Sequence, residues 1–391
     1  MNILLTGAAG FIGSNLAQKL LNNPFQRSAF SFEPSVKKEL RATSYELLHA
    51  PRVRAFLRYT SRADLGLLST LPREILDRID IIFGDLRDSS AILEAARGCD
   101  LIYHLGALIS IPYSYLHPVE TVQSNILGTL NILEAARQLG IPVVHTSTSE
   151  VYGTALRVPI DEGHPLQGQS PYSASKIGAD KLVESYYKSF NVPTITVRPF
   201  NTYGPGQSAR AVIPTIITQA LTQDHLNLGA LDTKRDFTYI DDTVQGFLLA
   251  GQSLLSAVHS GSSSKLPKDS EVQRGANTQN STLNPQQLKS STAQQLVSGE
   301  TFNLGTGYEV TIGQVTEIIL NILRKPNLPI LQDPARLRPE KSEVLRLLSD
   351  NTKAREVLNW SPEIDLEQGL ERTIAWISDH LDRYRIGTYE R

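Results

Sequence analysis

Two short stretches of the chain carry side chains that can move protons. The stretch HTSTSEVYG, residues 145–153, follows the apolar residues IPVV and presents four hydroxyls in a row before the carboxylate of Glu150. Downstream, SPYSASK places Tyr172 and Lys176 four residues apart at the start of an expected helix, so both lie on one face. A phenol with a pKa of about 10 is a poor base at neutral pH, but a neighbouring ammonium favours the phenolate. The two stretches therefore predict a site for acid–base chemistry.

A glycine-rich turn near the N-terminus predicts where a cofactor binds. TGAAGFIG places Gly7, Gly10 and Gly13 directly between an expected first strand and first helix. Gly7 permits the tight turn, Gly10 lets backbone approach a pyrophosphate, and Gly13 lets the helix pack closely on the strand. The start of the helix, at Phe11 and Ile12, offers unpaired N–H groups and a positive dipole to the phosphates. We therefore expect this turn to bind a dinucleotide.

The end of the second expected strand bears on which dinucleotide is bound. A carboxylate there would suit the ribose of NAD, whereas Arg58 stands at that place and favours the extra phosphate of NADP. Arg58 and the nearby Arg62 can equally be solvated surface residues. The residues therefore predict NAD(P) and leave the choice open. Further cofactor contacts are expected from Asp85 and Leu86 of GDLRD and from Leu105, Gly106 and Ala107 of HLGA.

The elements that must position these side chains follow a regular alternation. Short apolar runs alternate with amphipathic helical patterns over the first 200 residues, and strands are expected at 2–7, 53–59, 79–86, 100–107, 143–148 and 194–201. Apolar runs without polar alternation suit strands that are covered on both faces. The pattern predicts an α/β fold with a doubly wound, Rossmann-type parallel sheet and a smaller C-terminal α/β substrate lobe.

The expected domain boundary lies at residue 198, with a dinucleotide-binding domain before it and a substrate-binding lobe after it. Segments near 236–251 and 301–305 are expected to return to the first domain. Two insertions interrupt the alternation. Residues 23–50 form an insertion that we expect to be at least partly ordered. Residues 255–299, rich in Ser, Gln and Asn, bury too little apolar area to offset the entropy of ordering, and predict a flexible surface loop.

Composition excludes several classes of function. The formal net charge of −2 gives no global field for nucleic acid or an anionic membrane. The single cysteine, Cys99, excludes an intramolecular disulfide and a CxxC metal site, and no two histidines have HxxxH spacing, so no metal is expected. No secretory signal and no run of 18 apolar residues is present, which predicts a cytoplasmic protein.

Taken together, the motifs resemble those of the extended short-chain dehydrogenases/reductases that modify nucleotide sugars. The resemblance rests on TGxxGxxG, GDLRD, NILGT with Asn125, YSASK, RPFNTYGPG, RDFTYIDD and FNLGTG, and covers nearly the whole chain except the two insertions. It implies that Thr148, Tyr172 and Lys176 surround the C4 hydroxyl of the sugar. It also implies NAD as the cofactor, with Asn125, Tyr172 and Lys176 in its site, and a homodimer formed through the helices that contain NILGT and YSASK.

The stretch HTSTSEVYG separates the chemistries within this family. A 4,6-dehydratase must eliminate water across C5 and C6, and Glu150 is expected to be the base at C5. Glu150 itself or Ser149 is expected to give the proton to the leaving hydroxyl at C6. Many dTDP-glucose dehydratases carry Asp where this chain has Ser149. Thr-Ser-Glu instead resembles GDP-mannose 4,6-dehydratases and UDP-glucuronate decarboxylases, so the motif alone leaves both open.

The residues that flank these motifs most resemble LegB-type 4,6-dehydratases, which act on nucleotide-linked N-acetylglucosamine. The expected reaction converts UDP- or GDP-N-acetylglucosamine to a 4-keto-6-deoxy sugar nucleotide. A UDP-glucuronate decarboxylase, a nucleotide-sugar 4-epimerase and, more remotely, a non-catalytic dinucleotide-binding sensor are the alternatives. Candidate ligands of the nucleotide diphosphate are Arg198, Asn201, Arg210, Arg235 and Arg346, since a guanidinium can hold phosphate through two bonds, although each can instead be structural.

Overall fold

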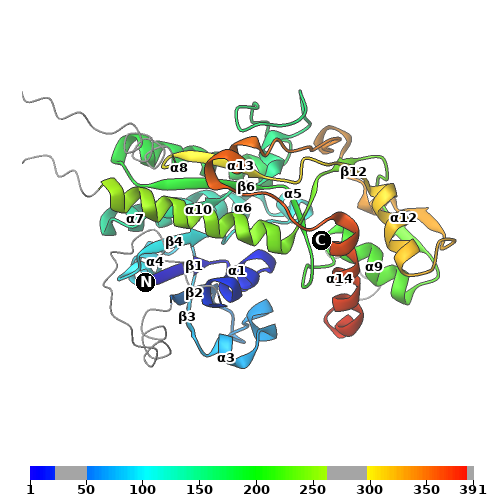
Figure 1. The fold of residues 1–391 in the computed structure, drawn as a ribbon, viewed down its shortest axis with the longest axis horizontal. Coiled ribbons are helices and arrows are strands. Elements are labelled where there is room, and N and C mark those ends of the chain that lie inside the picture. The colour runs from blue at the N-terminus through cyan, green and yellow to red at the C-terminus, as the bar shows by residue number, and fades with distance from the viewer. Residues whose placement is uncertain (23–50, 262–296, 385–391) are drawn as a thin grey trace, which may run out of the picture.

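The chain is built around a seven-stranded parallel sheet (Figure 1). The computed structural model describes residues 1–22, 51–261 and 297–384. The sheet order is β11-β6-β5-β4-β1-β2-β3, and every neighbouring pair is parallel. Its strands are β1 (Asn2–Thr6), β2 (Arg52–Arg58), β3 (Ile79–Gly84), β4 (Leu101–His104), β5 (Val143–Thr146), β6 (Thr194–Pro199) and β11 (Glu300–Leu304).

Helices cover both faces of this sheet, as the apolar runs predict. Ile3 and Leu5 of β1 point into one core cluster and Leu4 into another, and all three are fully buried. The first cluster is covered by α1 (Phe11–Asn22) and α10 (Ile240–Gly261), and the second by α4 (Ser89–Ala96), α7 (Gly128–Leu139) and α8 (Pro171–Phe190). This arrangement confirms the doubly wound α/β class.

The strand order reverses between β1 and β4, which fixes the place of a ligand. In open parallel sheets, ligands bind in the crevice at the carboxyl ends of the strands on either side of such a reversal. Gly7 follows β1 there, and the loop that begins at Leu105 follows β4. The expected phosphate turn and the HLGA segment thus lie side by side, and the amide of Leu105 donates to the carbonyl of Thr6 at 3.2 Å.

A smaller lobe of helices and short sheets follows β6 and lies to the right in Figure 1. Three two-stranded sheets, β7–β10, β8–β13 and β9–β12, accompany its helices. Its elements are β7 (Asn201–Tyr203), α9 (Val212–Thr222), β8 (Leu226–Leu228), β9 (Lys234–Arg235), β10 (Phe237–Tyr239), β12 (Val310–Thr311), α12 (Ile312–Ile322), β13 (Ile330–Gln332) and α14 (Leu366–Asp379). Helix α13 (Thr352–Leu358) packs instead on α10 and β11, beside the main sheet (Figure 1). Its apolar residues belong to the same core cluster as one face of the main sheet.

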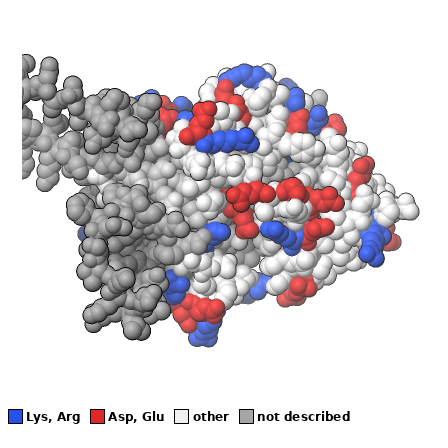
Figure 2. Space-filling model, in the orientation of Figure 1, with Lys and Arg blue, Asp and Glu red and all other residues white. Residues whose placement is uncertain are grey.

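Short helices fill several of the connections between these elements. They are η2 (Gly66–Thr70), α3 (Arg73–Leu76), α5 (Ile111–Leu116), α6 (Pro118–Val122), the π-helical turn η3 (Gln123–Leu127), η4 (Ser149–Tyr152), η5 (Pro334–Arg336), η6 (Glu340–Ser342) and η7 (Leu381–Arg383). Within the described ranges, none of the helices combines the length and apolar character that crossing a bilayer requires. On the face shown in Figure 2, basic side chains are scattered among acidic ones.

The structure corrects one expected boundary. The second insertion was expected from residue 255, but α10 continues to Gly261, because Leu255 and Ala257 still pack against the core. The remainder of that insertion up to residue 296, and all of the first insertion at 23–50, lie outside the described residues. Strand β11 is an edge strand of the main sheet, and α10 packs on the neighbouring strands β4, β5 and β6. The division at residue 198 stays a prediction.

Candidate active site

The turn after β1 leaves the space that dinucleotide phosphates need. Gly7 has φ +72°, a conformation that L side chains rarely adopt, and a Cβ there would come within 2.7 Å of the Gly106 amide nitrogen. A Cβ on Gly13 would collide with the Gly7 carbonyl. The amide of Gly10 donates to the Gly7 carbonyl at 3.0 Å, and α1 begins at Phe11. Only glycines allow this close packing, so the turn fits the pyrophosphate of a dinucleotide.

A cavity of about 200 Å³ lies beside this turn, where the strand ends meet. Six of the expected cofactor residues line it together with Ser124, namely Gly7, Arg58, Asp85, Leu86, Gly106 and Ala107. Leu105, Phe11 and Ile12 do not line it and are partly buried against the core. The cavity is mostly apolar and bordered by polar groups, which suits the adenosine end of a dinucleotide.

Asn125 reaches the cofactor region indirectly. Its side chain accepts from the Leu108 amide at 2.8 Å and donates to the Leu108 carbonyl at 2.9 Å and to Ser175 Oγ at 2.9 Å. It is 1% exposed. Asn125 thereby ties the loop after β4 to α8, the helix that carries Tyr172, and its expected role becomes that of holding the cofactor loop in place.

Arg58 has a protein carboxylate as its partner. Its Nη2 lies 3.1 Å from Glu120 Oε1, and the Tyr113 hydroxyl donates to Glu120 Oε2 at 2.6 Å. Tyr113 and then Arg58 lower the pKa of Glu120, so the carboxylate stays ionised. Asp85 is paired likewise, with Arg87 at 2.6 Å. Because Glu120 already balances the charge of Arg58, the arginine no longer argues for the additional phosphate of NADP.

The expected reaction centre forms where β5 and α8 meet. Thr148 caps η4, and its Oγ1 accepts from the Glu150 amide at 3.2 Å, which places Glu150 in the first turn. Ser170 and Ser173 form a capping box that starts α8 and so fixes the position of Tyr172. Thr148 forms a hydrogen bond with the Tyr172 phenol. Ser149, which lies between Thr148 and Glu150 in the sequence, is buried, with 3% of its surface exposed.

Burial dominates the electrostatics of the pair on α8. It raises the pKa of Tyr172, and the Thr148 hydrogen bond only partly opposes this. Burial lowers the pKa of Lys176 to about 8, against the opposing charge of Asp180. The Lys176 ammonium donates to the Thr146 carbonyl at 2.6 Å, at the end of β5. Tyr172 therefore needs further positive charge nearby before it can act as a base.

A buried charge network lies behind this centre. Asp180, one turn beyond Lys176, accepts from Ser147 Oγ at 2.8 Å and from Arg198 Nη2 at 2.8 Å. Arg198 also donates to the Tyr152 hydroxyl at 2.9 Å. Burial by itself raises the pKa of Asp180, but its partners lower it to about 2. Arg198, expected to hold a diphosphate, is 5% exposed and serves instead as the counter-ion of Asp180.

The buried histidine in this network predicts an acid-sensitive fold. Burial, with the charge of Lys176 adding to it, lowers the pKa of His145 to about 4, from an ordinary value of 6.5. Asp180, Arg198 and His104 also face His145. Its Nε2 lies 3.3 Å from Asp180 Oδ1. Between pH 6.5 and 4, His145 takes up a proton in the unfolded chain but stays neutral in the native chain. As the pH falls through this range, the free energy of unfolding should therefore fall by about 3 kcal/mol.

Urea denaturation across this pH range measures the fall. His145→Gln should show a shallower slope, although the neighbouring His104, whose pKa burial also lowers, still contributes. Equal slopes for the wild type and His145→Gln would contradict the assignment to His145.

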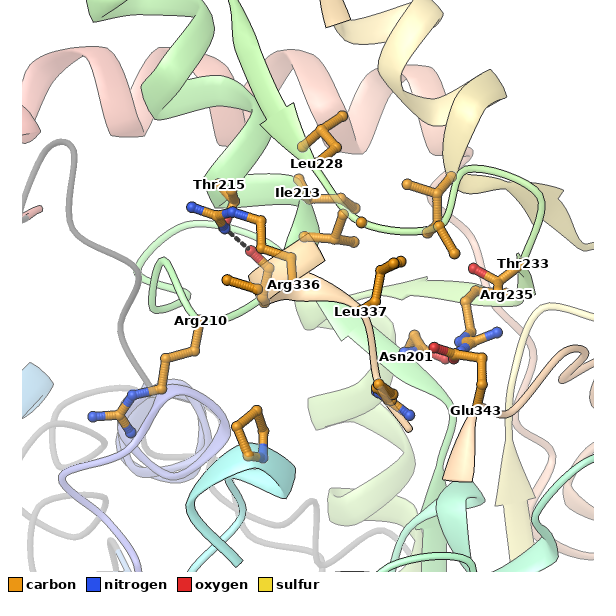
Figure 3. Close-up of a pocket in the computed structure, with 18 of the residues that line it drawn as sticks. Asn201, Arg210, Ile213, Thr215, Leu228, Thr233, Arg235, Arg336, Leu337 and Glu343 are labelled. Atoms are coloured by element: carbon orange, nitrogen blue, oxygen red, sulfur yellow. Dashed lines mark hydrogen bonds and ion pairs between the residues drawn. The ribbon is translucent and has the colours of Figure 1, made fainter. Parts of the chain in front are cut away.

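A second cavity, of about 440 Å³, lies between the lobes and carries several cationic side chains (Figure 3). Of the expected diphosphate ligands, Asn201, Arg210 and Arg235 line it. Arg346 does not line it and makes a two-bond ion pair with Glu309, at 2.6 and 2.7 Å. The cavity therefore brings together three of the five expected residues.

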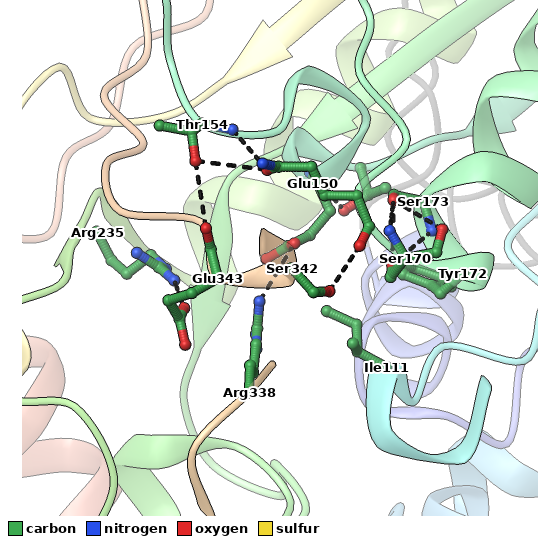
Figure 4. A network of polar contacts seen from close by, with 12 residues as sticks. Ile111, Glu150, Thr154, Ser170, Tyr172, Ser173, Arg235, Arg338, Ser342 and Glu343 are labelled. Carbon is green, nitrogen blue, oxygen red and sulfur yellow. Dashed lines mark hydrogen bonds and ion pairs between the residues drawn. The ribbon is translucent and has the colours of Figure 1, made fainter. Parts of the chain in front are cut away.

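The cavity also contains residues that sequence reasoning missed. Arg336, Arg338 and Glu343 line it, all from the segment that joins β13 to α13. Arg338 Nη1 lies 3.5 Å from Glu150 Oε2, so this segment reaches the reaction centre (Figure 4). The only sequence signal is a cluster of arginines beside the prolines of DPARLRPEK. Nothing in that cluster indicates which part of the fold it contacts.

Comparisons with known proteins agree with this geometry. The family model described as GDP-mannose 4,6 dehydratase matches residues 41–271. The chain belongs to this dehydratase family. Its resemblance to the extended short-chain dehydrogenases/reductases that act on nucleotide sugars is thereby confirmed.

Relatives within this family carry out more than one reaction. The chain is 28% identical to a UDP-glucose 4-epimerase of Mycolicibacterium smegmatis, over 96% of this chain and 98% of the relative. It is equally 28% identical to a dTDP-glucose 4,6-dehydratase of Streptomyces antibioticus, over 97% and 93%. A dTDP-glucose 4,6-dehydratase from Streptomyces venezuelae, solved with NAD bound, superposes with a TM-score of 0.73 at 26% identity and covers 98% of this chain and 99% of that one.

Membership makes the chain an enzyme of the nucleotide-sugar epimerase/dehydratase family. The site itself holds acid–base groups and arginines. Among the described residues, no group of three His, Cys, Asp or Glu side chains could hold a metal ion. The geometry supports proton transfer next to a dinucleotide and an anionic substrate.

Proposed function

We propose that the chain is a nucleotide-sugar 4,6-dehydratase that converts UDP- or GDP-N-acetylglucosamine to a 4-keto-6-deoxy sugar nucleotide. One observation carries the proposal: the carboxylate of Glu150 stands beside Tyr172 and Thr148 at the end of the arginine-lined cavity. Oxidation at C4 needs only a base for the hydroxyl, whereas dehydration needs a second base at C5. Glu150 supplies that second base.

NAD fits the cradle next to the reaction centre. The glycine turn at Gly7, Gly10 and Gly13 would hold its pyrophosphate, and the cavity that Asp85 and Leu86 line would hold its adenosine. NAD is preferred to NADP because Glu120 neutralises Arg58, and because the Streptomyces venezuelae relative was solved with NAD. Bound there, NAD would supply a hydride acceptor for C4 and, once reduced, a hydride donor for C6, so no net cofactor would be consumed.

The side chains of the protein handle the protons. Tyr172, hydrogen-bonded to Thr148, takes the proton of the C4 hydroxyl, and the Lys176 ammonium favours the resulting phenolate. The 4-keto group then acidifies the C5 hydrogen, which Glu150 abstracts as a proton. The C6 hydroxyl leaves as water after it receives a proton from Glu150 or through Ser149. Addition of hydride at C6 also requires a proton at C5, which Glu150 passes from solvent, and Tyr172 releases the C4 hydroxyl proton to solvent. The net change is therefore the loss of one water.

The nucleotide diphosphate is assigned to the larger cavity. Arg235 and Arg338 are its foremost ligands, because both line the cavity and Arg338 reaches Glu150. Arg210 and Asn201 line the same cavity, and Asn201 Oδ1 is buried there with no hydrogen-bond partner among the residues that the structure describes. Arg198 and Arg346 are withdrawn from this role because Asp180 and Glu309 hold them.

Product mass tests the reaction. Incubation with UDP- and GDP-N-acetylglucosamine should give a product lighter by one water. An unchanged mass with altered stereochemistry at C4 would identify a 4-epimerase instead. Loss of carbon dioxide from UDP-glucuronate would identify a decarboxylase, and no turnover of any sugar nucleotide would leave the sensor alternative. The homodimer and the cytoplasmic location stay predictions.

Replacing Glu150 separates the two halves of the reaction. Glu150→Gln should lower the rate of water loss by a factor of about 10²–10⁴, the usual contribution of a positioned general base. Oxidation at C4 should continue, because Tyr172 is intact, and reduced nicotinamide should accumulate and be visible by absorbance. The matched control is Glu309→Gln, which removes a carboxylate of equal exposure, 13%, outside the cavity. Dehydration at the wild-type rate in Glu150→Gln would exclude Glu150 as the base.

A further inference from the structure

Two arginines and two carboxylates meet where the larger cavity joins the reaction centre (Figure 4). Arg338 pairs with Glu150 at 3.5 Å, and Arg235 pairs with Glu343 at 3.4 Å. All four side chains are mostly buried, with Arg338 the most exposed at 27%. The group is neutral as a whole, so an anion that enters the cavity must compete with a carboxylate for its cations.

Arg338 lies where it can contact either Glu150 or an anion in the larger cavity. It lines the cavity assigned to the diphosphate, whereas Glu150 does not, and its guanidinium also contacts Glu150. The Arg338–Glu150 separation of 3.5 Å exceeds the roughly 2.7–2.9 Å of a strong charge-assisted hydrogen bond. A phosphate can offer the guanidinium a two-bond contact, which is the better geometry.

We propose that the diphosphate of the bound nucleotide sugar competes with Glu150 for Arg338, so that substrate binding releases Glu150 to act as the base. This inference rests on the proposed function, which assigns the cavity to the diphosphate and Glu150 to C5. In the ion pair, the Glu150 carboxylate is held by the guanidinium of Arg338. Moving Arg338 to the phosphate frees Glu150 to contact the sugar only when a substrate is bound.

Nucleotide affinity measures this competition without any turnover. The probe is whichever of UDP, GDP and dTDP binds the wild-type protein best by titration calorimetry. Glu150→Gln should bind it roughly three- to tenfold more tightly, because Arg338 no longer has to leave a carboxylate. Arg338→Gln should bind it more weakly, since it loses a phosphate ligand. Uridine or guanosine, which lack phosphate, should bind the wild type and Glu150→Gln equally.

A double-mutant cycle separates the exchange from a general field effect. In the Arg338→Gln background, the Glu150→Gln change should have no effect on affinity. Equal tightening in both backgrounds would mean that Glu150 merely repels the anion, and would overturn the proposal, as would unchanged affinity in Glu150→Gln. Glu309→Gln, whose partner Arg346 lies outside the cavity, should bind like the wild type.

Further variants keep the outcome interpretable. Arg338→Lys retains the cation, so Glu150→Gln should still tighten binding in that background even if Arg338→Gln folds poorly. A product that has not lost water would refute the dehydratase assignment but leave this coupling intact. An absent coupling in an active dehydratase would refute only the exchange.

Discussion

Tyr172→Phe should lower kcat for oxidation at C4 by a factor of about 10²–10⁴, the largest effect on turnover expected of any single change at the site. The substitution removes the phenol oxygen to which we assign the C4 hydroxyl proton and leaves the ring in its buried place on α8. Nucleotide affinity should change little, because Tyr172 does not line the larger cavity, to which we assign the nucleotide diphosphate. Single-turnover formation of reduced nicotinamide measures the oxidation directly.

The control for this change lies on the same helix. Tyr186→Phe removes a hydroxyl that donates to Glu134 of α7, and Tyr186 lines neither of the two cavities. It should retain the wild-type kcat. If Tyr172→Phe kept a rate within tenfold of the wild type, another group would have to be the base at C4.

Asp180→Asn should lower the free energy of unfolding by about 3–5 kcal/mol, which is the usual cost of removing one partner of a buried ion pair. The substitution keeps the size of the side chain but leaves Arg198, itself 5% exposed, without its counter-ion. It also removes the opposing charge that supports the Lys176 ammonium. Urea denaturation at pH 7 measures the loss.

An exposed carboxylate on the same helix is the comparison for Asp180. Glu184→Gln breaks ion pairs with Lys181 and Lys188 on the surface, and should cost less than about 1 kcal/mol. Adding Arg198→Met to Asp180→Asn should recover part of the lost stability, because the buried guanidinium that had lost its counter-ion is then absent. Equal losses for Asp180→Asn and Glu184→Gln would show that the buried pair contributes no more to the free energy of unfolding than the surface ion pairs do.

Features fixed by local spacing were predictable from the sequence. The glycine turn, the YxxxK pair and the alternation of strands and helices each depend on residues close together in the chain. The parallel sheet then brings the strand ends together, which is why Gly7, Asp85 and Gly106 line one cavity as expected. The fold class, and the meeting of these residues at one cavity, therefore followed from pattern alone. Their role in binding the cofactor stays a prediction.

Partners that come from distant parts of the chain were not predictable. Arg58 meets Glu120 across 62 positions, and Arg338 meets Glu150 from a segment that gives no signal of where it packs. Arg198 looks like a phosphate ligand in RPFNTYGPG, but the sheet buries it against Asp180. The sequence does not distinguish a charged residue that faces a ligand from one that faces a counter-ion, because only tertiary packing decides between the two.

The edge strand β11 has a consequence for synthesis of the protein. It pairs with β6 along five positions, from Glu300 to Leu304, although about a hundred residues separate the two strands in the chain. While the ribosome is still adding those residues, β6 has an open edge, and open edges invite pairing with other nascent chains. The sheet that carries the reaction centre can be completed only after residue 304 has emerged. Slow elongation between β6 and β11 would therefore prolong the interval in which the newly made chain is most prone to aggregate.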